Sequence, residues 1–360
     1  MIFRVLIALM LCFGLAGQSP YDGMDKPRKK SKKNKKDEEP VTQVLPLPKD
    51  LPVVITADID RLTFFASPLS SKGLLTAQTR EALRYLTGLS KTATIVKLRV
   101  FVAGSGDTRR IQTLVGEVMT EKKLPLPVVI TVQVGSLGVE GAQVLFEATA
   151  VDKRSLNPEG LAFISGQVGK SLREAVAGLE RASVAVGGAA TVSMTCFVSS
   201  LDDVAGERAG MAFTGVVVQL RREPSPTVAE CEGIARLRKA PVGAVELVNP
   251  EGSAKSANYS QVALVRASKV AFSGLQLSFG TDAKLAFERL GKTLEGGGVT
   301  YGNVFFAHTY ALTAAAMEQV RGVRFGYFDK ARPPASTLLP FEGLPSLDAT
   351  FGVEVVAVVP

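Results

Sequence analysis

Few side chains in this sequence could perform nucleophilic or metal-assisted chemistry. His308 is the only histidine, and Cys12, Cys196 and Cys231 are the only cysteines. A single histidine excludes metal sites built from several histidines, and it leaves little for Ser-His or Cys-His machinery. We therefore expect no metal and no cofactor.

Three glutamates recur in similar apolar surroundings. Glu147 stands in Phe-Glu-Ala, Glu232 in Cys-Glu-Gly and Glu354 in Val-Glu-Val. A carboxylate in such a strand can take part in binding a ligand. It can equally accept backbone N–H bonds at the end of the strand, and both roles stay open.

Regular elements surround the first of these glutamates. Alternating apolar residues predict strands over 53–59, 61–67, 94–102, 128–134 and 143–151, the first two joined by a tight turn as a hairpin. Amphipathic spacing predicts helices over 76–89 and 107–122, with Asp107 as the N-cap of the second. The order is β-β-α-β-α-β-β.

The same order recurs twice, which indicates an internal repeat. The second unit has strands over 161–167, 191–198, 215–220 and 227–237 and helices over 172–185 and 202–212. The third has a hairpin of strands 262–266 and 269–273, helices over 282–294 and 314–320, and strands over 304–312, 336–339 and 350–359. Asn-Pro-Glu-Gly at 157–160 returns at 249–252, and the second strands end in Ser67, Ser165 and Ser273. We predict an α+β chain of three tandem units, 53–152, 153–240 and 241–360.

Local motifs give these units a family resemblance. Asn-Tyr-Ser-Gln at 258–261, followed by Val-Ala-Phe-Ser-Gly at 270–274, is similar to the G-P-Y-S-Q and V-F-V-S-G-Q pattern of the Rid (RidA/YjgF) family. Phe-Ile-Ser-Gly-Gln at 163–167 repeats the second half, although no Tyr-Ser-Gln precedes Phe163. Thr-Val-Gln-Val at 131–134 resembles the strand after the family's P-x-R-[ST] motif, and the three glutamates stand where the family has the Glu of its last strand. The resemblance covers about residues 53–360.

This resemblance implies a fold and an assembly. The family has a chorismate-mutase-like α+β fold and forms homotrimers, with sheets facing inward, helices outside and pockets between subunits. Three units in one chain then imply an intramolecular pseudo-trimer and a chain that is monomeric in solution. Fusion would remove most of the entropic cost of assembly.

It also implies a chemistry. Family members hydrolyse enamines or imines to ketones and ammonia, using an Arg that grips the substrate carboxylate and a Glu with a water. The position of that Arg reads Val129, Gly215 and Ala335 in the three units, and none of these can bind a carboxylate. A shifted register across Pro333-Pro334 would instead place Arg332 in the third unit, next to Tyr259 or a neighbouring Glu.

Two functions follow from this pattern. The first is a Rid-like scaffold without catalysis that binds a small carboxylate or imine-like ligand or docks an envelope protein. The alternative is an enamine or imine deaminase that uses one surviving pocket, with Arg332 as the candidate catalytic residue. The candidate ligand-binding residues are Glu147, Glu232, Glu354, Tyr259, Ser165 and Ser273. Arg99, Thr195 and His308 align at one strand position, for which we predict an exposed strand face rather than a pocket.

The N-terminal residues predict secretion. Arg4 precedes an apolar run over 5–15, with small residues Gly14, Ala16 and Gly17 where a signal peptidase could cut, so 1–17 is predicted to be a signal peptide. An uncleaved anchor is the alternative. The location is then secreted or periplasmic.

Residues 18–52 are predicted to be a disordered linker that is first Lys-rich and then Pro-rich. Eight basic residues lie within 26–36, without aromatic residues for base stacking. We expect contact with an anionic membrane surface and no binding of nucleic acid. The net charge of +8 owes much to this segment.

Cys196 and Cys231 both lie in apolar strand-like stretches. They could form one disulfide in an oxidising compartment, or remain two buried thiols. We favour the two thiols.

Overall fold

The structure is a computed structural model, and it describes residues 50–104, 107–211, 215–221, 228–251, 253 and 256–360. The predicted signal peptide, the basic segment and nearly all of the linker lie outside these residues. None of the helices in the described part is long and apolar enough to span a membrane.

The helices form where the apolar spacing predicts them. Asp107 caps α2 as expected, because its side chain accepts the backbone N–H of Arg109. Ser171, Ser200 and Thr313 cap three further helices in the same way. The helices are α1 Leu75–Gly88, α2 Thr108–Glu121, α3 Leu172–Ala185, α4 Leu201–Ala209, α5 Lys284–Gly296 and α6 Ala314–Val323.

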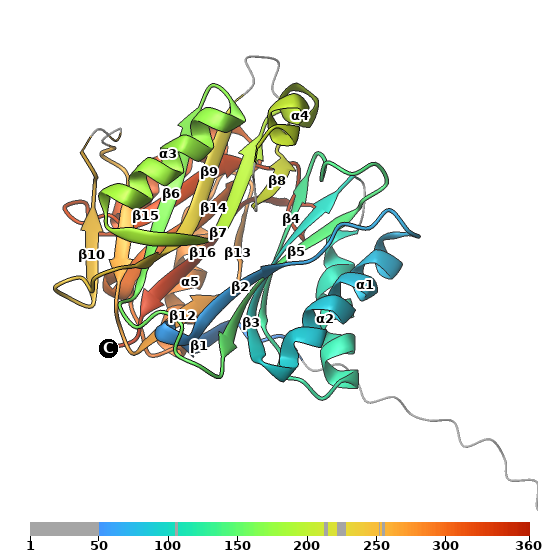
Figure 1. The fold of residues 1–360 in the computed structure, drawn as a ribbon, viewed down its shortest axis with the longest axis horizontal. Coiled ribbons are helices and arrows are strands. Elements are labelled where there is room, and N and C mark those ends of the chain that lie inside the picture. Colours follow the sequence, from blue (N-terminus) through green and yellow to red (C-terminus); the bar gives the residue numbers. More distant parts are fainter. Residues whose placement is uncertain (1–49, 105–106, 212–214, 222–227, 252, 254–255) are drawn as a thin grey trace, which may run out of the picture. The chain divides into compact units, whose positions relative to one another are not determined.

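The strands form three mixed sheets (Figure 1). Sheet 1 has the order β2-β5-β3-β4, with β2 Leu62–Ala66, β3 Ala93–Ala103, β4 Val128–Val134 and β5 Val144–Asp152. Sheet 2 has the order β10-β11-β6-β9-β7-β8, with β6 Leu161–Gly169, β7 Gly188–Val198, β8 Val216–Gln219, β9 Ala229–Leu237, β10 Val245–Val248 and β11 Val262–Val265. Sheet 3 has the order β1-β12-β16-β14-β15, with β1 Val54–Asp58, β12 Lys269–Ser273, β14 Val304–Ala311, β15 Ala335–Pro340 and β16 Ala349–Val358, and β13 Gln276–Phe279 also pairs with β16.

All three sheets share one inner arrangement. The central strands β3, β7 and β14 each pair antiparallel with the strand that carries a glutamate, namely β5, β9 and β16. On their other edge the same central strands pair in parallel with β4, β8 and β15. Parallel pairing requires a crossover, and α2, α4 and α6 provide it.

The two predicted hairpins are wrong. β1 pairs antiparallel with β12 of sheet 3 instead of with β2, and β11 pairs antiparallel with β6 of sheet 2 instead of with β12. A 3-10 turn at Ile59–Arg61 separates β1 from β2, and the chain crosses there from sheet 3 to sheet 1. Each first strand therefore completes a sheet that another part of the chain builds.

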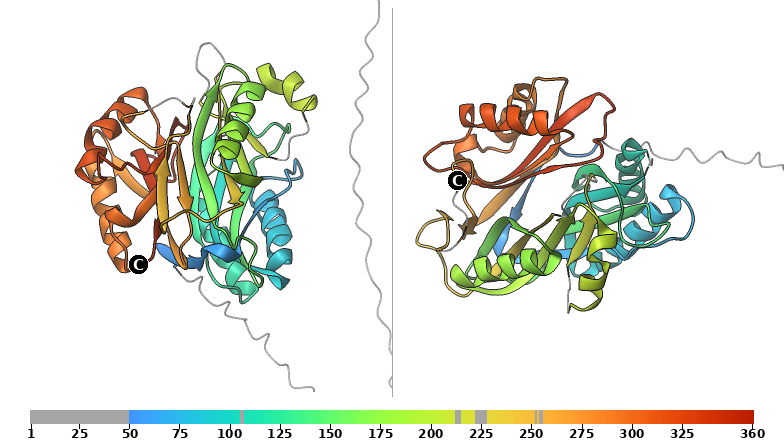
Figure 2. Two further views of the ribbon diagram at one scale, coloured as in Figure 1. Left: turned by 60° about the vertical axis from the view of Figure 1, so that its left-hand side comes forward. Right: turned by 90° about the horizontal axis from the view of Figure 1, so that it is seen from above.

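Helices cover the outer face of each sheet, and the inner faces share one core (Figure 2). Three separate clusters of buried apolar residues join α1 and α2 to sheet 1, α3 and α4 to sheet 2, and α5 and α6 to sheet 3. A fourth cluster takes residues from all three sheets, including Phe101, Phe163 and Phe305. The sheets are thus buried on both faces, which gives nearly continuous apolar strands such as β3.

Cys196 and Cys231 form a disulfide between the paired strands β7 and β9. The expectation of two free thiols is therefore wrong. The two residues are directly opposite each other in the antiparallel ladder, where Cβ atoms come close enough for a bridge.

Candidate functional site

The strand register brings the three glutamates opposite the three aligned residues of the central strands. Arg99 pairs with Glu147, Thr195 with Glu232, and His308 with Glu354. The six side chains come from all three sheets and meet in the shared interior. Because the register is the same in each sheet, one structural position carries Arg, Thr and His.

Arg99 connects the three sheets at this point. Its Nε donates to Glu147 Oε2 at 2.6 Å, and its Nη1 donates to Glu232 Oε1 at 2.6 Å. Its Nη2 donates to the hydroxyl of Thr195 at 3.0 Å, and that hydroxyl in turn donates to Glu147. With all three nitrogens engaged, the guanidinium is held in one orientation.

His308 extends the network to the third sheet. Its Nε2 lies 2.9 Å from Glu232 Oε1, and its Nδ1 lies 3.2 Å from Glu354 Oε1. Glu354 also accepts a hydrogen bond from Tyr310 at 2.9 Å and forms an ion pair with Lys97. We refer to Lys97, Arg99, Glu147, Thr195, Glu232, His308, Tyr310 and Glu354 as the central cluster.

The charges of the central cluster hold one another in the ionised state. Burial by itself would raise the pKa of Glu232, yet the charges of His308 and Arg99 outweigh burial and lower it below its usual value. Burial likewise opposes the ionisation of Glu354, but Lys97 and His308 lower its pKa to about 2. Burial would lower the pKa of His308, and Glu232 raises it above its usual value. Lys97, Arg99 and, in its protonated form, His308 therefore face three carboxylates.

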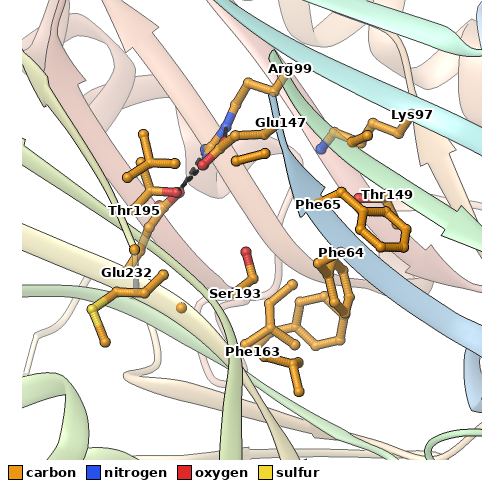
Figure 3. Close-up of a pocket in the computed structure, with 18 of the residues that line it drawn as sticks. Phe64, Phe65, Lys97, Arg99, Glu147, Thr149, Phe163, Ser193, Thr195 and Glu232 are labelled. Carbon is orange, nitrogen blue, oxygen red and sulfur yellow. Dashed lines mark hydrogen bonds and ion pairs between the residues drawn. The ribbon is translucent and has the colours of Figure 1, made fainter. Parts of the chain in front are cut away.

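A cavity of about 170 Å³ adjoins the central cluster (Figure 3). Arg99, Glu147, Thr195, Glu232 and His308 form its polar side. The rest of the wall is largely apolar and includes Phe64, Phe65, Phe163, Phe272, Phe306, Val192, Met194 and Val356. Sheet 1 contributes β2, sheet 2 contributes β6, the middle of β7 and the start of β8, and sheet 3 contributes β12, β14 and β16.

Arg99, Thr195 and His308 line this cavity, so the predicted exposed strand face is wrong for all three. Arg99 retains only 8% of its exposure and Thr195 only 2%. The inner faces of the three sheets cover one another, and a residue on such a face cannot reach solvent freely.

The register also corrects the position expected for the family's Arg in the third unit. Leu98 pairs with Val129, and the equivalent residue Ala307 pairs with Ser336 rather than Ala335. Gly215 directly precedes Val216, the partner of Thr195, and so keeps its assigned place. The position is therefore occupied by Val129, Gly215 and Ser336, none of which carries a charge.

The other predicted site residues lie apart from this cluster. Ser165 is buried, and its hydroxyl donates to the backbone oxygen of Gln261 at 2.9 Å. The buried hydroxyl of Ser273 accepts the backbone N–H of Val355. Both contacts hold strands together. Arg332 lies on an exposed loop, where its side chain donates to the backbone oxygen of Val245 at 3.0 Å.

Tyr259 lies in a second polar group that includes residues the sequence did not single out. Burial raises the pKa of Tyr259, and the nearby charge of Glu230 raises it further. Burial, and then the charge of Glu232, raise the pKa of Glu230 to about 8. The charge of Arg324 acts in the opposite direction and lowers the pKa of Tyr259. Burial lowers the pKa of the Arg324 guanidinium itself to about 10.

Lys97, Tyr310, Glu230 and Arg324 were thus missed by sequence reasoning. Lys97 and Tyr310 each lie two residues from an aligned position, on the same strand face, so period-two spacing could have indicated them. Arg324 follows α6 and has no such signal. In the described ranges, no group of three or more His, Cys, Asp or Glu side chains is placed to hold a metal ion.

No family model and no curated protein matches this chain. Among solved structures, the Rid-family protein YyfB from Yersinia pestis is similar at 17% identity and a TM-score of 0.30, over 32% of this chain and 99% of that one. Rv2704 from Mycobacterium tuberculosis, of the YjgF/YER057c/UK114 family, is similar at 21% identity and a TM-score of 0.24, over 32% and 99%. The yeast protein YEO7 is similar at 18% identity and a TM-score of 0.24, over 32% and 97%. Scores this low do not establish membership, so the family assignment is a proposal.

Proposed function

We propose that this chain is a Rid-like protein of three tandem diverged units, 53–152, 153–240 and 241–360, folded as an intramolecular pseudo-trimer. We propose further that it binds a small ligand without catalysing a reaction on it. The shared inner order of the three sheets and their common interior support the first part of the proposal.

The pairing of positive and negative side chains within the central cluster supports the proposal of binding without catalysis. A general acid or base works best with a pKa near the working pH. Here Glu232 and Glu354 are held ionised by internal cations, and Arg99 is saturated by internal acceptors. The guanidinium of Arg99 is thus not free to bind a substrate carboxylate, and neither Glu232 nor Glu354 is poised to take up a proton at neutral pH.

The same balance indicates the chemistry of the ligand. A charged ligand would leave its charge unpaired in the cavity, because each internal charge already has a partner, and an unpaired buried charge is costly. Aromatic and aliphatic side chains form most of the wall, with polar contacts available at Ser193 and Thr149. We therefore propose a neutral and predominantly apolar ligand, in place of the small carboxylate that the resemblance implies.

Fluorescence of N-phenyl-1-naphthylamine, a neutral apolar dye, tests this proposal. The dye should brighten on binding to the mature chain, and Ser193→Phe should abolish the signal because it fills the cavity. Ala189→Phe is a matched control, since Ala189 is exposed on the same strand and outside the cavity wall. Equal signals from both variants would contradict binding in this cavity.

The group around Tyr259 favours the alternative function, an enamine or imine deaminase. Glu230 is held largely protonated at neutral pH and could donate a proton. Nε and Nη2 of Arg324 form the side of a guanidinium that grips a carboxylate, and neither has a hydrogen-bond partner among the residues that the structure describes. Arg324 thus offers the group that Arg332 was expected to supply.

Ammonia release from a freshly generated imino acid separates the two functions. The binding protein should release ammonia no faster than the uncatalysed reaction. Release that Arg324→Met abolishes and Arg332→Ala leaves intact would establish the deaminase and reject the first proposal. Arg332 is a suitable control because it is exposed and its side chain donates to the backbone oxygen of Val245.

We propose that the protein acts outside the cytoplasm, as a secreted or periplasmic protein. The predicted signal peptide and the disulfide between Cys196 and Cys231 support this location, since disulfides persist in oxidising compartments. Residues 26–36 could then contact an anionic membrane surface.

A further inference from the structure

Sheet 1 ends in a strand edge that no further strand of the described residues covers, whereas the equivalent edges of the other two sheets are covered. β2 is the terminal strand of sheet 1, whereas β11 covers the equivalent edge of β6 and β1 covers that of β12. Both covering strands run antiparallel to the strand they cover, and both come from a different part of the chain. Three equivalent edges thus share only two covering strands among the described residues.

The backbone of β2 presents free groups at this edge. Ser67 donates its N–H to Phe146 of β5, so by the alternation of a strand Leu62, Phe64 and Ala66 direct their backbone groups away from β5. The oxygen of Leu62 accepts a side-chain bond from Asn157 at 2.9 Å. No partner within the described residues takes up the outward groups of Phe64 and Ala66.

The cavity lies at this same edge. Phe64, Phe65 and Ala66 form one wall, and Val192 and Val216 stand on the wall built by sheet 2. The corresponding place between sheets 2 and 3 is closed. There Ser260, just before β11, forms an isolated bridge with Ala335 of β15, and its hydroxyl donates to the oxygen of Pro333 at 2.7 Å.

We infer that an extended peptide segment of another protein adds to β2 as an antiparallel strand and places its apolar side chains in the cavity. This inference rests on the proposed function, because it names the ligand class of the same cavity. Unpaired strand edges bind peptides through main-chain hydrogen bonds, and side-chain pockets give the selectivity.

The sequences of the two covering strands indicate which kind of segment would fit the edge of β2. β1 reads Val-Ile-Thr-Ala-Asp and β11 reads Val-Ala-Leu-Val, so each is short, rich in β-branched residues and free of proline. A neutral segment such as β11 satisfies the charge balance of the central cluster and places apolar side chains against Phe64 and Phe65.

The test uses the mature chain and a synthetic peptide with the sequence of residues 260–265, acetylated and amidated so that it is neutral. At a peptide concentration about ten times its Kd, amide hydrogen exchange of segment 62–67 should slow about tenfold. The peptide should also displace N-phenyl-1-naphthylamine. The same peptide with proline in place of Ala263 cannot donate at that position and should have neither effect.

Two matched variants test the edge itself. Ala66→Pro removes an N–H that points away from β5, so the sheet should keep its pairing while the peptide loses a partner. Ala66→Val keeps that N–H and should retain peptide binding. Circular dichroism and the intact disulfide check that both variants fold.

The remaining outcomes overturn the inference in distinguishable ways. If the dye binds but the peptide neither displaces it nor slows exchange, the peptide inference is wrong and the proposed function stands. If neither binds, both are wrong. If segment 62–67 is protected without peptide and light scattering gives a dimer mass, a second copy covers β2 and the peptide inference is overturned.

Discussion

At the scale of single residues, the central cluster depends on three different side chains at one equivalent position. In an assembly of identical chains, three copies of the same residue would meet there, and three arginines would repel one another. In this chain Arg99, Thr195 and His308 meet instead, and Lys97 joins Arg99 and His308 in facing the three carboxylates. Because the three positions differ, only Arg99 and His308 bring basic groups there, and the neutral hydroxyl of Thr195 donates to Glu147.

Glu232→Gln should destabilise the protein strongly. Glu232 is buried and lies within hydrogen-bond distance of both Arg99 and His308, so its neutralisation leaves these buried groups one carboxylate short. Removing one partner of a buried ion pair costs about 3–5 kcal/mol. Urea unfolding measures the effect, and Glu246→Gln, at an exposed carboxylate of β10, should stay within about 0.5 kcal/mol of the wild type. A similar loss in both variants would contradict a special role for the cluster.

The contribution of His308 should depend on pH. Because its pKa in the folded state is raised, its stabilising effect is complete below the unfolded pKa of about 6.5 and is lost as pH rises through the folded value. His308→Gln should therefore cost most in slightly acidic solution and progressively less in alkaline solution. Unfolding of both proteins over a pH series gives the difference, and a cost that grows with pH would refute the assignment of charge.

The sequence identified the glutamates but misplaced their partners. Glu147, Glu232 and Glu354 were found because similar residues surround them, and similarity along the chain is visible without a structure. Arg99 was expected on an exposed strand face rather than in a pocket. A strand that is buried on both faces shows no alternation, so its pattern cannot indicate which side a charge takes.

At the scale of elements, helix and strand positions could be predicted and strand partners could not. The helix that Asp107 caps and the three glutamate strands lie close to their predicted ranges, because amphipathic spacing and caps are local signals. The strands β11 and β12 are only a few residues apart, which favours a hairpin locally. Their pairing with β6 and β1 instead depends on packing between distant parts of the chain.

The disulfide should stabilise sheet 2 measurably. The bridge joins residues 35 positions apart, and a loop of this size makes a contribution of about 2–4 kcal/mol. The mature chain should show no reactive thiol toward maleimide when unfolded without reductant, and two after reduction. The double variant Cys196→Ala with Cys231→Ala should unfold at a lower temperature by a matching amount. Two thiols that react before reduction would contradict the bridge.

At the scale of the whole molecule, strand pairing between distant parts of the sequence should hold two separate fragments of the chain together. β1 belongs to sheet 3 although it precedes sheet 1, and the central core takes residues from every sheet. Residues 18–153 and 154–360, produced together as separate chains, should therefore purify as one complex of equal amounts, held by β1 on β12. A first fragment that begins at residue 60 lacks β1 and should associate much more weakly, since the edge of β12 is then unpaired. Size-exclusion chromatography with light scattering measures both, and fragments that elute separately in the first case would show that the three sheets are independent domains.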